Sequence, residues 1–114
     1  METILTEIDD VIGVRGSFVV GADGEVAATT MSAVYESREL NSAGRALQRT
    51  IEGLQIESDQ TVIEMNLQYS GGRLVVKSVD KGCLVILCEP DINVSLLNLT
   101  ANVAVRKISE QLLT

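Results

Sequence analysis

The side chains that could carry out catalysis are few, and none of them forms a recognisable catalytic arrangement. The chain has no histidine, which excludes a serine–histidine–aspartate triad and any histidine metal ligand. Asp9 and Asp10 are adjacent on an expected helix, where neighbouring side chains diverge, so they indicate a solvated helix end. The sequence has no P-loop. We therefore expect no enzyme activity of its own, and no catalytic, cofactor-binding or metal-binding residues.

The two cysteines, Cys83 and Cys88, lie on one expected strand. Residues an odd number of positions apart on a strand point to opposite faces, and the two Cα atoms would lie about 16 Å apart, beyond disulfide reach. The pair predicts buried structural thiols, and neither a redox couple nor a metal site. Gly13 and Gly16 lie at the start of an expected strand instead of opening a helix, which argues against a dinucleotide-binding loop.

Length and composition describe a small acidic protein. The 114 residues suffice for a single domain, expected to span 1–114, and 46% of them are apolar. A mean hydropathy of +0.23 favours an interface between copies of the chain. The net charge of −7, the 3% aromatic content and the absence of Trp exclude a nucleic-acid-binding surface. We see no signal peptide and no apolar run of the ~20 residues that membrane insertion requires, so we expect a cytoplasmic protein.

The stretch from Thr61 to Cys88 organises the expected fold. It predicts three antiparallel strands over 61–69, 73–79 and 83–88, joined by two turns. The first strand has one apolar face, formed by Ile63, Met65, Leu67 and Tyr69. The third strand is apolar on both faces, so it must lie near the middle of a sheet with helices on both sides.

Turn signals and helical periodicity place the remaining elements. Asp23-Gly24 predicts a hairpin between strands at 14–20 and 25–29, and Gly71-Gly72 predicts another through positive φ angles. Helical patterns cover 3–12, capped by Thr3, then 39–54, and 94–113, capped by Asn93. The order αββαβββα predicts an α+β fold, a five-stranded antiparallel sheet sandwiched by helices.

Two of these helices have apolar or small residues beyond the stripe that would pack on the sheet. The core stripe of the helix at 39–54 is expected to be Leu40, Gly44, Leu47, Ile51 and Leu54. Beside it runs a flank of small residues, which would let another helix approach closely or would fit against the sheet: Ser42, Ala43, Ala46, Thr50 and Gly53.

The helix at 94–113 has apolar residues on two sides. Its core stripe is expected to be Leu97, Ala101, Ala104, Val105, Ile108 and Leu112. The opposite side carries Leu96, Leu99 and Val103. A helix of this kind is either wholly buried or docks something on its outer side.

The order of these segments resembles the roadblock/dynein light chain family, and within it the prokaryotic MglB-like branch. The resemblance covers nearly the whole chain and depends on the ordered set, because no single segment is specific. The segments are Ile12–Val20, Ala22–Ala27, Gly71–Val76 and Gly82–Leu87, with Asn93 opening a long terminal helix.

The resemblance implies a dimer, with itself or with a paralogue. In such a dimer the third strand pairs with its copy and the second helices pack side by side. The dimer interface would then contain Ser42, Ala46, Thr50, Gly53, Ile63, Met65, Leu67 and Tyr69. The partner-binding face would contain Arg45, Arg49, Leu96, Leu99 and Val103.

Members of this family commonly bind or regulate Ras-like small GTPases, or act as adaptors. The resemblance therefore implies a dimeric, non-catalytic regulator or scaffold that binds a Ras-like small GTPase, with stimulation of GTP hydrolysis as a further option. An arginine supplied in trans could act in that stimulation; Arg45 and Arg49 are candidates, although solvated helix-face arginines would look the same. The alternatives are a structural adaptor subunit of a motor or signalling complex and a small-molecule sensor lined by Glu64, Asn66 and Gln68.

Overall fold

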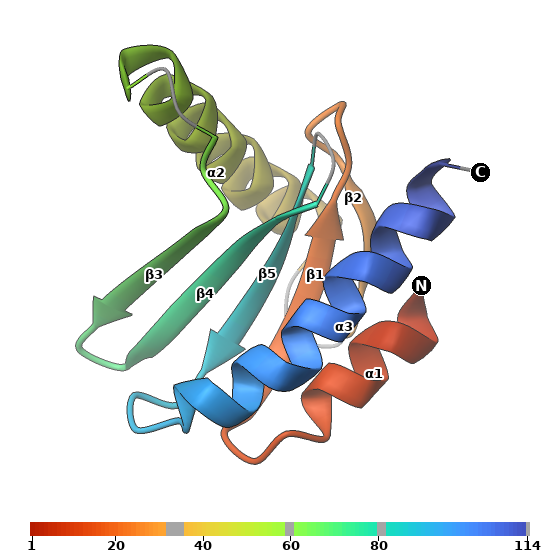
Figure 1. The fold of residues 1–114 in the computed structure, drawn as a ribbon, viewed down its shortest axis with the longest axis vertical. Coiled ribbons are helices and arrows are strands. Elements are labelled where there is room, and N and C mark those ends of the chain that lie inside the picture. The colour runs from red at the N-terminus through yellow and green to blue at the C-terminus, as the bar shows by residue number, and fades with distance from the viewer. Residues whose placement is uncertain (32–35, 59–60, 80–81, 114) are drawn as a thin grey trace.

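The computed structural model describes residues 1–31, 36–58, 61–79 and 82–113. Within them the elements follow the expected order αββαβββα (Figure 1). The helices are α1 (Glu2–Asp9), α2 (Ser37–Ser58) and α3 (Val94–Leu113). The strands are β1 (Val14–Val20), β2 (Val26–Thr29), β3 (Glu64–Tyr69), β4 (Gly72–Val79) and β5 (Gly82–Cys88).

The strands form one antiparallel sheet in the order β2-β1-β5-β4-β3. β5 lies at the centre, and its residues Leu84, Val85 and Ile86 are fully buried. The prediction that this strand is covered on both faces is therefore confirmed. β3 lies at one edge of the sheet, where its outer side has no neighbour among the described strands.

Helices cover the two faces of the sheet unequally (Figure 1). α1 and α3 lie side by side on one face, which we call the front, and pack on the sheet through Leu5, Ile8, Leu97 and Ile108. Of the described helices, only α2 covers the other face, the rear, where Leu40 and Ile51 join a cluster with Phe18, Val76 and Val85. The predicted sandwich of a sheet between helices is confirmed.

The ends of α1 differ from the prediction. Its N-cap is Met1, without a side-chain hydrogen bond, so the expected cap at Thr3 was wrong. The helix ends at Asp9, and Ile12, which was expected to close its apolar face, lies outside it and is 90% exposed. The reason is the turn into β1: Gly13 has a φ of 99°, and a Cβ there would lie only 3.1 Å from Ile92 Cγ1. The chain reverses over Ile92 and leaves Ile12 outside.

α2 is longer than its periodicity predicts. It extends to Ser58, and its C-terminal turns project past the sheet at the upper left of Figure 1. Leu54 is therefore 48% exposed, and its place in the core stripe was wrong. The polar side of α2 holds the β1–β2 hairpin: the Val26 amide donates to Asn41 Oδ1 (2.8 Å) and Gln48 Nε2 donates to the Ala22 carbonyl (3.0 Å).

α3 agrees with its prediction. The Leu96 amide donates to Asn93 Oδ1 at 3.0 Å, which confirms the cap. The buried stripe contains Leu97, Ala101, Ala104 and Ile108; the side chain of Leu112 lies outside what the structure describes. Most of the segment that connects β2 to α2 and the turn at 80–81 also fall outside the described residues.

The glycines act differently in the two hairpins. Gly24 has a φ of 81°, as the Asp-Gly turn predicts. Neither Gly71 nor Gly72 lies in the left-handed region, so the expected positive φ angles were wrong. Gly72 is instead required by space, because a Cβ there would lie 2.8 Å from both the Cys88 carbonyl oxygen and the Tyr69 hydroxyl.

We expect glycine-to-alanine substitutions at two sites on α2 to have opposite effects. A Cβ on Gly44 would lie 2.6 Å from Val20 Cγ2, whereas nothing lies within 4 Å of one on Gly53. Alanine is favoured in a helix by about 1 kcal/mol, and overpacking costs about 1–3 kcal/mol. Gly44→Ala should lower the free energy of unfolding in urea by about 1 kcal/mol, and Gly53→Ala should raise it by up to about 1 kcal/mol. Equal stabilisation by both would contradict the close packing of α2 on β1.

The two buried thiols should make stability depend on alkaline pH. Burial raises the pKa of Cys83 to about 11, and that of Cys88 to about 11 against the opposing charges of Arg73 and Arg15. The unfolded chain releases these protons near its ordinary pKa of 9.0, so the stabilisation is fully present below pH 9 and is lost as the pH rises through 11. A Cys83→Ala/Cys88→Ala variant should show a flatter fall in unfolding free energy over this range; an unchanged slope would contradict this assignment.

Candidate protein-interaction surfaces

The outer edge of β3 is an open hydrogen-bonding edge. The Ser78 amide donates to the Ile63 carbonyl at 3.0 Å, so the backbone of Ile63 faces β4. Because backbone groups alternate in direction along a strand, the N–H and C=O groups of Glu64, Asn66 and Gln68 point away from the sheet. An open edge of this kind is a template for another strand.

The apolar side chains of β3 lie on the rear face and are poorly covered. Met65 and Leu67 stand opposite Val76 and Leu74 of β4, both of which belong to or border the rear cluster. The strand begins at Glu64 and not at residue 61 as predicted, so Ile63, which is 76% exposed, immediately precedes it. Leu67 and Tyr69 on the strand are 46% and 49% exposed. The expected edge strand is thus confirmed, and its apolar face remains open in the single chain.

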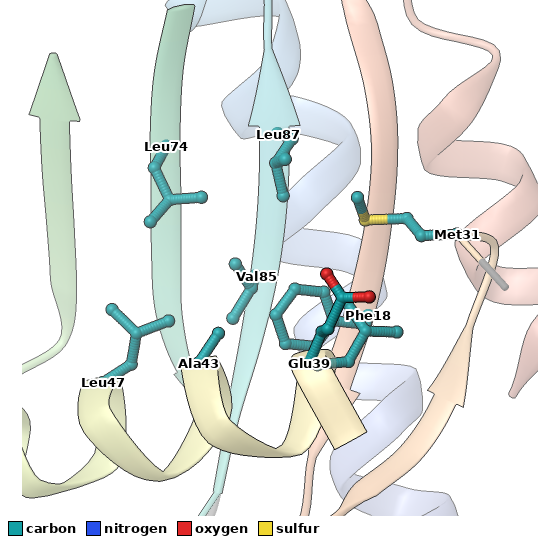
Figure 2. Close-up of a pocket in the computed structure, with 9 residues that line it drawn as sticks. Phe18, Met31, Glu39, Ala43, Leu47, Leu74, Val85 and Leu87 are labelled. Carbon is teal, nitrogen blue, oxygen red and sulfur yellow. The ribbon is translucent and has the colours of Figure 1, made fainter. Parts of the chain in front are cut away.

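A cavity of about 270 Å³ adjoins this surface on the rear face. Figure 2 shows α2 as one wall, Met31 as the opposite wall and the side chains of β4, β5 and β1 as the floor. Among the described residues that line the cavity, Glu39 is the only charged one. The remaining lining is apolar: Phe18, Met31, Leu40, Ala43, Leu47, Leu74, Val85 and Leu87. Such a lining suits a hydrophobic side chain from another helix better than a polar ligand.

The small-residue flank of α2 faces solvent. Ser42, Ala46, Thr50 and Gly53 are all exposed, and the Thr50 hydroxyl is satisfied by the Ala46 carbonyl (2.9 Å) within the helix. Farther along the helix, Leu54 and Ile56 are 48% and 82% exposed. These four residues are therefore not used against the sheet, whereas Ala43 of the same flank lines the cavity, and the flank continues into two exposed aliphatic side chains.

The two candidate arginines of α2 differ in their contacts. Arg45 forms an ion pair with Glu25 of the β1–β2 turn (3.4 Å), and both side chains are largely exposed. Arg49 is also exposed and has no ion-pair partner among the described residues. Arg49 is the one whose charge remains available to a binding partner.

Two charged contacts near β3 escaped sequence reasoning. On the front face, Lys77 is only 7% exposed and forms an ion pair with Glu64. At the lower end of the sheet, Arg15 donates two hydrogen bonds to the Glu89 carboxylate, at 3.1 and 2.8 Å. The hydrogen bond from Arg15 lowers the pKa of Glu89, and Glu89 raises the pKa of Arg15. These partners are distant in sequence, so only the strand register could reveal them.

The residues expected to line a sensor site lie away from the apolar cavity. Glu64, Asn66 and Gln68 alternate with the apolar residues of β3 and therefore lie on the front face, whereas the cavity opens on the rear. Glu64 is instead engaged by Lys77. No group of three or more potential metal ligands gathers among the residues that the structure describes.

The third surface is the outer side of α3. Leu96, Leu99 and Val103 are 47%, 69% and 45% exposed, in agreement with their predicted outward position. α3 is the outermost layer on the front of the molecule (Figure 1). Within the described part of the chain, no helix is both long enough and apolar enough to cross a membrane.

Comparisons with known proteins follow the architecture. No family model matches the chain. It is 25% identical over 109 residues to an uncharacterized protein of Methanocaldococcus jannaschii, covering 95% of this chain and 96% of that protein. A roadblock/LC7 domain from Streptomyces avermitilis superposes with a TM-score of 0.82 at 16% identity, covering 100% of this chain and 98% of that one. Myxococcus xanthus MglB superposes with a TM-score of 0.80 at 13% identity, covering 95% and 93%.

These likenesses concern the whole chain and the complete order of its elements. At such identities they establish architecture. The chain has the roadblock/LC7 fold, in the form that MglB also has.

Proposed function

We propose that this protein is a cytoplasmic, non-catalytic dimer that binds a Ras-like small GTPase as a regulator or scaffold. The observation that carries the proposal is the open edge of β3, with exposed apolar side chains on the same strand. The GTPase partner is supported by the architectural likeness to roadblock domains and MglB, because the family that this fold resembles commonly binds such GTPases.

The alternation of side chains on β3 favours one register for the dimer. Antiparallel pairing of Asn66 with its own copy places Met65 opposite Leu67 and Ile63 opposite Tyr69. All four apolar side chains then meet a counterpart on the rear face, and the outward backbone groups of residues 64, 66 and 68 are all paired. A register centred on Leu67 would leave Ile63 opposite Gly71, which offers no side chain.

The same two-fold axis brings the α2 helices together on the rear face. The C-terminal turns of α2 project past the sheet (Figure 1), so in a dimer they extend over the partner's uncovered rear surface. Leu54 and Ile56 are the exposed aliphatic side chains at that end, and the apolar cavity of Figure 2 lies on the surface they would cover. The small flank at Ser42, Ala46, Thr50 and Gly53 lets the paired helices approach closely.

The paired α2 helices then form a platform with Arg45 and Arg49 near its outer surface. Arg45 is held by Glu25, which argues against its insertion into a GTPase active site. We therefore propose that the platform recognises its partner by shape and charge. Stimulation of GTP hydrolysis, if it occurs, would come from ordering the GTPase's own catalytic groups.

Cysteine cross-linking tests the register. Directly opposite Cα atoms of paired strands lie about 4.5–5.5 Å apart, within disulfide range. We expect Asn66→Cys to form a disulfide-linked dimer rapidly under mild oxidation, measured by non-reducing electrophoresis. Leu67→Cys is the matched control, because in this register each copy of residue 67 faces residue 65. Faster linkage of Leu67→Cys would contradict the register, and failure of both variants would contradict the β3 interface.

Binding of a GTPase tests the function. We expect a Ras-like GTPase from the source cell, loaded with a fluorescent non-hydrolysable GTP analogue, to bind the dimer in a fluorescence polarisation titration. Arg49→Glu should weaken binding about tenfold, because it introduces repulsion at the platform. Lys107→Glu makes the same charge change on α3, on the opposite face and outside the apolar stripe of that helix, and should leave affinity unchanged.

The hydrolysis rate of the bound GTPase separates the two remaining roles. An increased single-turnover rate in the complex would identify a regulator, and an unchanged rate would identify a scaffold or adaptor. If no Ras-like GTPase from the source cell binds above the level of an Ala46→Arg variant, which should disrupt the platform, the proposed partner is wrong.

A further inference from the structure

The apolar stripe on the outer side of α3, formed by Leu96, Leu99 and Val103, is left open by the fold and by the proposed dimer. The three residues are 47%, 69% and 45% exposed, and their spacing places them along one side of the helix. The proposed β3–α2 interface lies at the sheet edge and on the rear face, whereas α3 is the outermost layer of the front (Figure 1). Dimerisation through β3 therefore does not cover this stripe.

We propose that the stripe binds the same stripe on another copy of the chain, with the two α3 helices antiparallel. This contact links one β3-paired dimer to another, so the inference rests on the proposed dimer for its biological unit. The contact between α3 helices can nevertheless be tested by itself.

The stripe is self-complementary in this orientation. A helix rises about 1.5 Å per residue, and a two-fold axis near Leu99 brings Leu96 to the level of Val103 in the other copy. Leu99 then packs near its own copy at the centre. Each exposed aliphatic side chain thus contacts another, which removes apolar surface from water on both helices.

Charges at the two ends of the helix fit the same orientation. In this register Arg106 lies at the level of Asn93 in the other copy, within reach of Asp91 in the turn before that helix. Both Arg106 and Asp91 are exposed and have no ion-pair partner among the described residues. By contrast, Lys107 is paired with Glu7 of α1 at 3.5 Å, and Glu89 is paired with Arg15.

These charges favour a second copy over an unrelated partner. The acidic group precedes the apolar stripe and the basic group follows it, so each copy supplies the complement that the other needs. Antiparallel helices also place the positive end of each macrodipole beside the negative end of the other. A stable protein–protein interface buries about 1,200 Å² or more, so a contact of three aliphatic residues per side should be weak and depend on concentration.

The assembly has a consequence for the proposed function. Contacts through α3 use the front of the sheet, so the α2 platform on the rear stays open in every dimer. Linked dimers would therefore present several GTPase-binding platforms on one particle, which raises avidity for clustered GTPases without any new contact.

The test is the mass of the purified chain, measured by sedimentation equilibrium over a concentration series. We expect the wild type to pass from dimer to multiples of the dimer as concentration rises. Leu99→Asp should hold it at the dimer, with association weakened about a hundredfold. Arg106→Asp and Asp91→Arg should each weaken association about tenfold, and the double variant should restore it. Thr3→Asp, which adds a charge on exposed α1 outside the stripe, should have no effect.

Several results would overturn the proposal. The first is a wild-type protein that remains a dimer at every concentration. The second is association that persists in Leu99→Asp. The third is a double variant that associates no more tightly than the single variants. Failure of the β3 dimer gives a different result. Asn66→Pro blocks the β3 edge, because it removes an outward N–H, and it should leave α3-linked pairs that Leu99→Asp converts to monomers. Monomers from Asn66→Pro alone would also exclude the α3 contact.

Discussion

The open edge of β3 is the constraint on which the interaction properties of this chain depend. Its backbone donors and acceptors at residues 64, 66 and 68 point away from β4, and the apolar side chains between them lie on a rear face that α2 covers only in part. One partner can meet both needs if its strand pairs with the backbone of the open edge and its helix covers the apolar face. In the proposed dimer, a second copy of the chain supplies both.

The difference between the two faces of the sheet follows from the number of helices. α1 and α3 cover the front face, and Lys77 and Glu64 form an ion pair on the same face, between β4 and β3. Among the described elements, the rear layer has only α2, which crosses part of the sheet and extends past its edge (Figure 1). The half-filled rear layer explains why the cavity beside α2 is apolar and why Leu54 and Ile56 are exposed in a helix that otherwise has a regular core stripe.

Much of the fold could be predicted because its signals are local. The two-sided apolar run of β5, the alternation of β3, the Asp-Gly turn and the Asn93 cap each depend on a few neighbouring residues, and each appears in the structure as expected. The errors fall where a distant contact decides. Ile92 packs against Gly13 in the turn between α1 and β1, and this turn leaves Ile12 exposed. The path of α2 past the sheet exposes Leu54. The contact of Gly72 with Tyr69 and Cys88 likewise has no local signal.

The sequence by itself determined the order of elements, the central place of β5, the absence of histidine chemistry and the outward position of Leu96, Leu99 and Val103. These depend on residue type and periodicity, which act over one or two turns of backbone. Only the tertiary structure decided that Arg45, and not Arg49, has an ion-pair partner among the described residues, that Glu64 is bound to a buried lysine, and that the apolar side of β3 adjoins a cavity. Strand register and the crossing of a helix over a sheet bring distant residues together, and a linear pattern does not encode which residues will then meet.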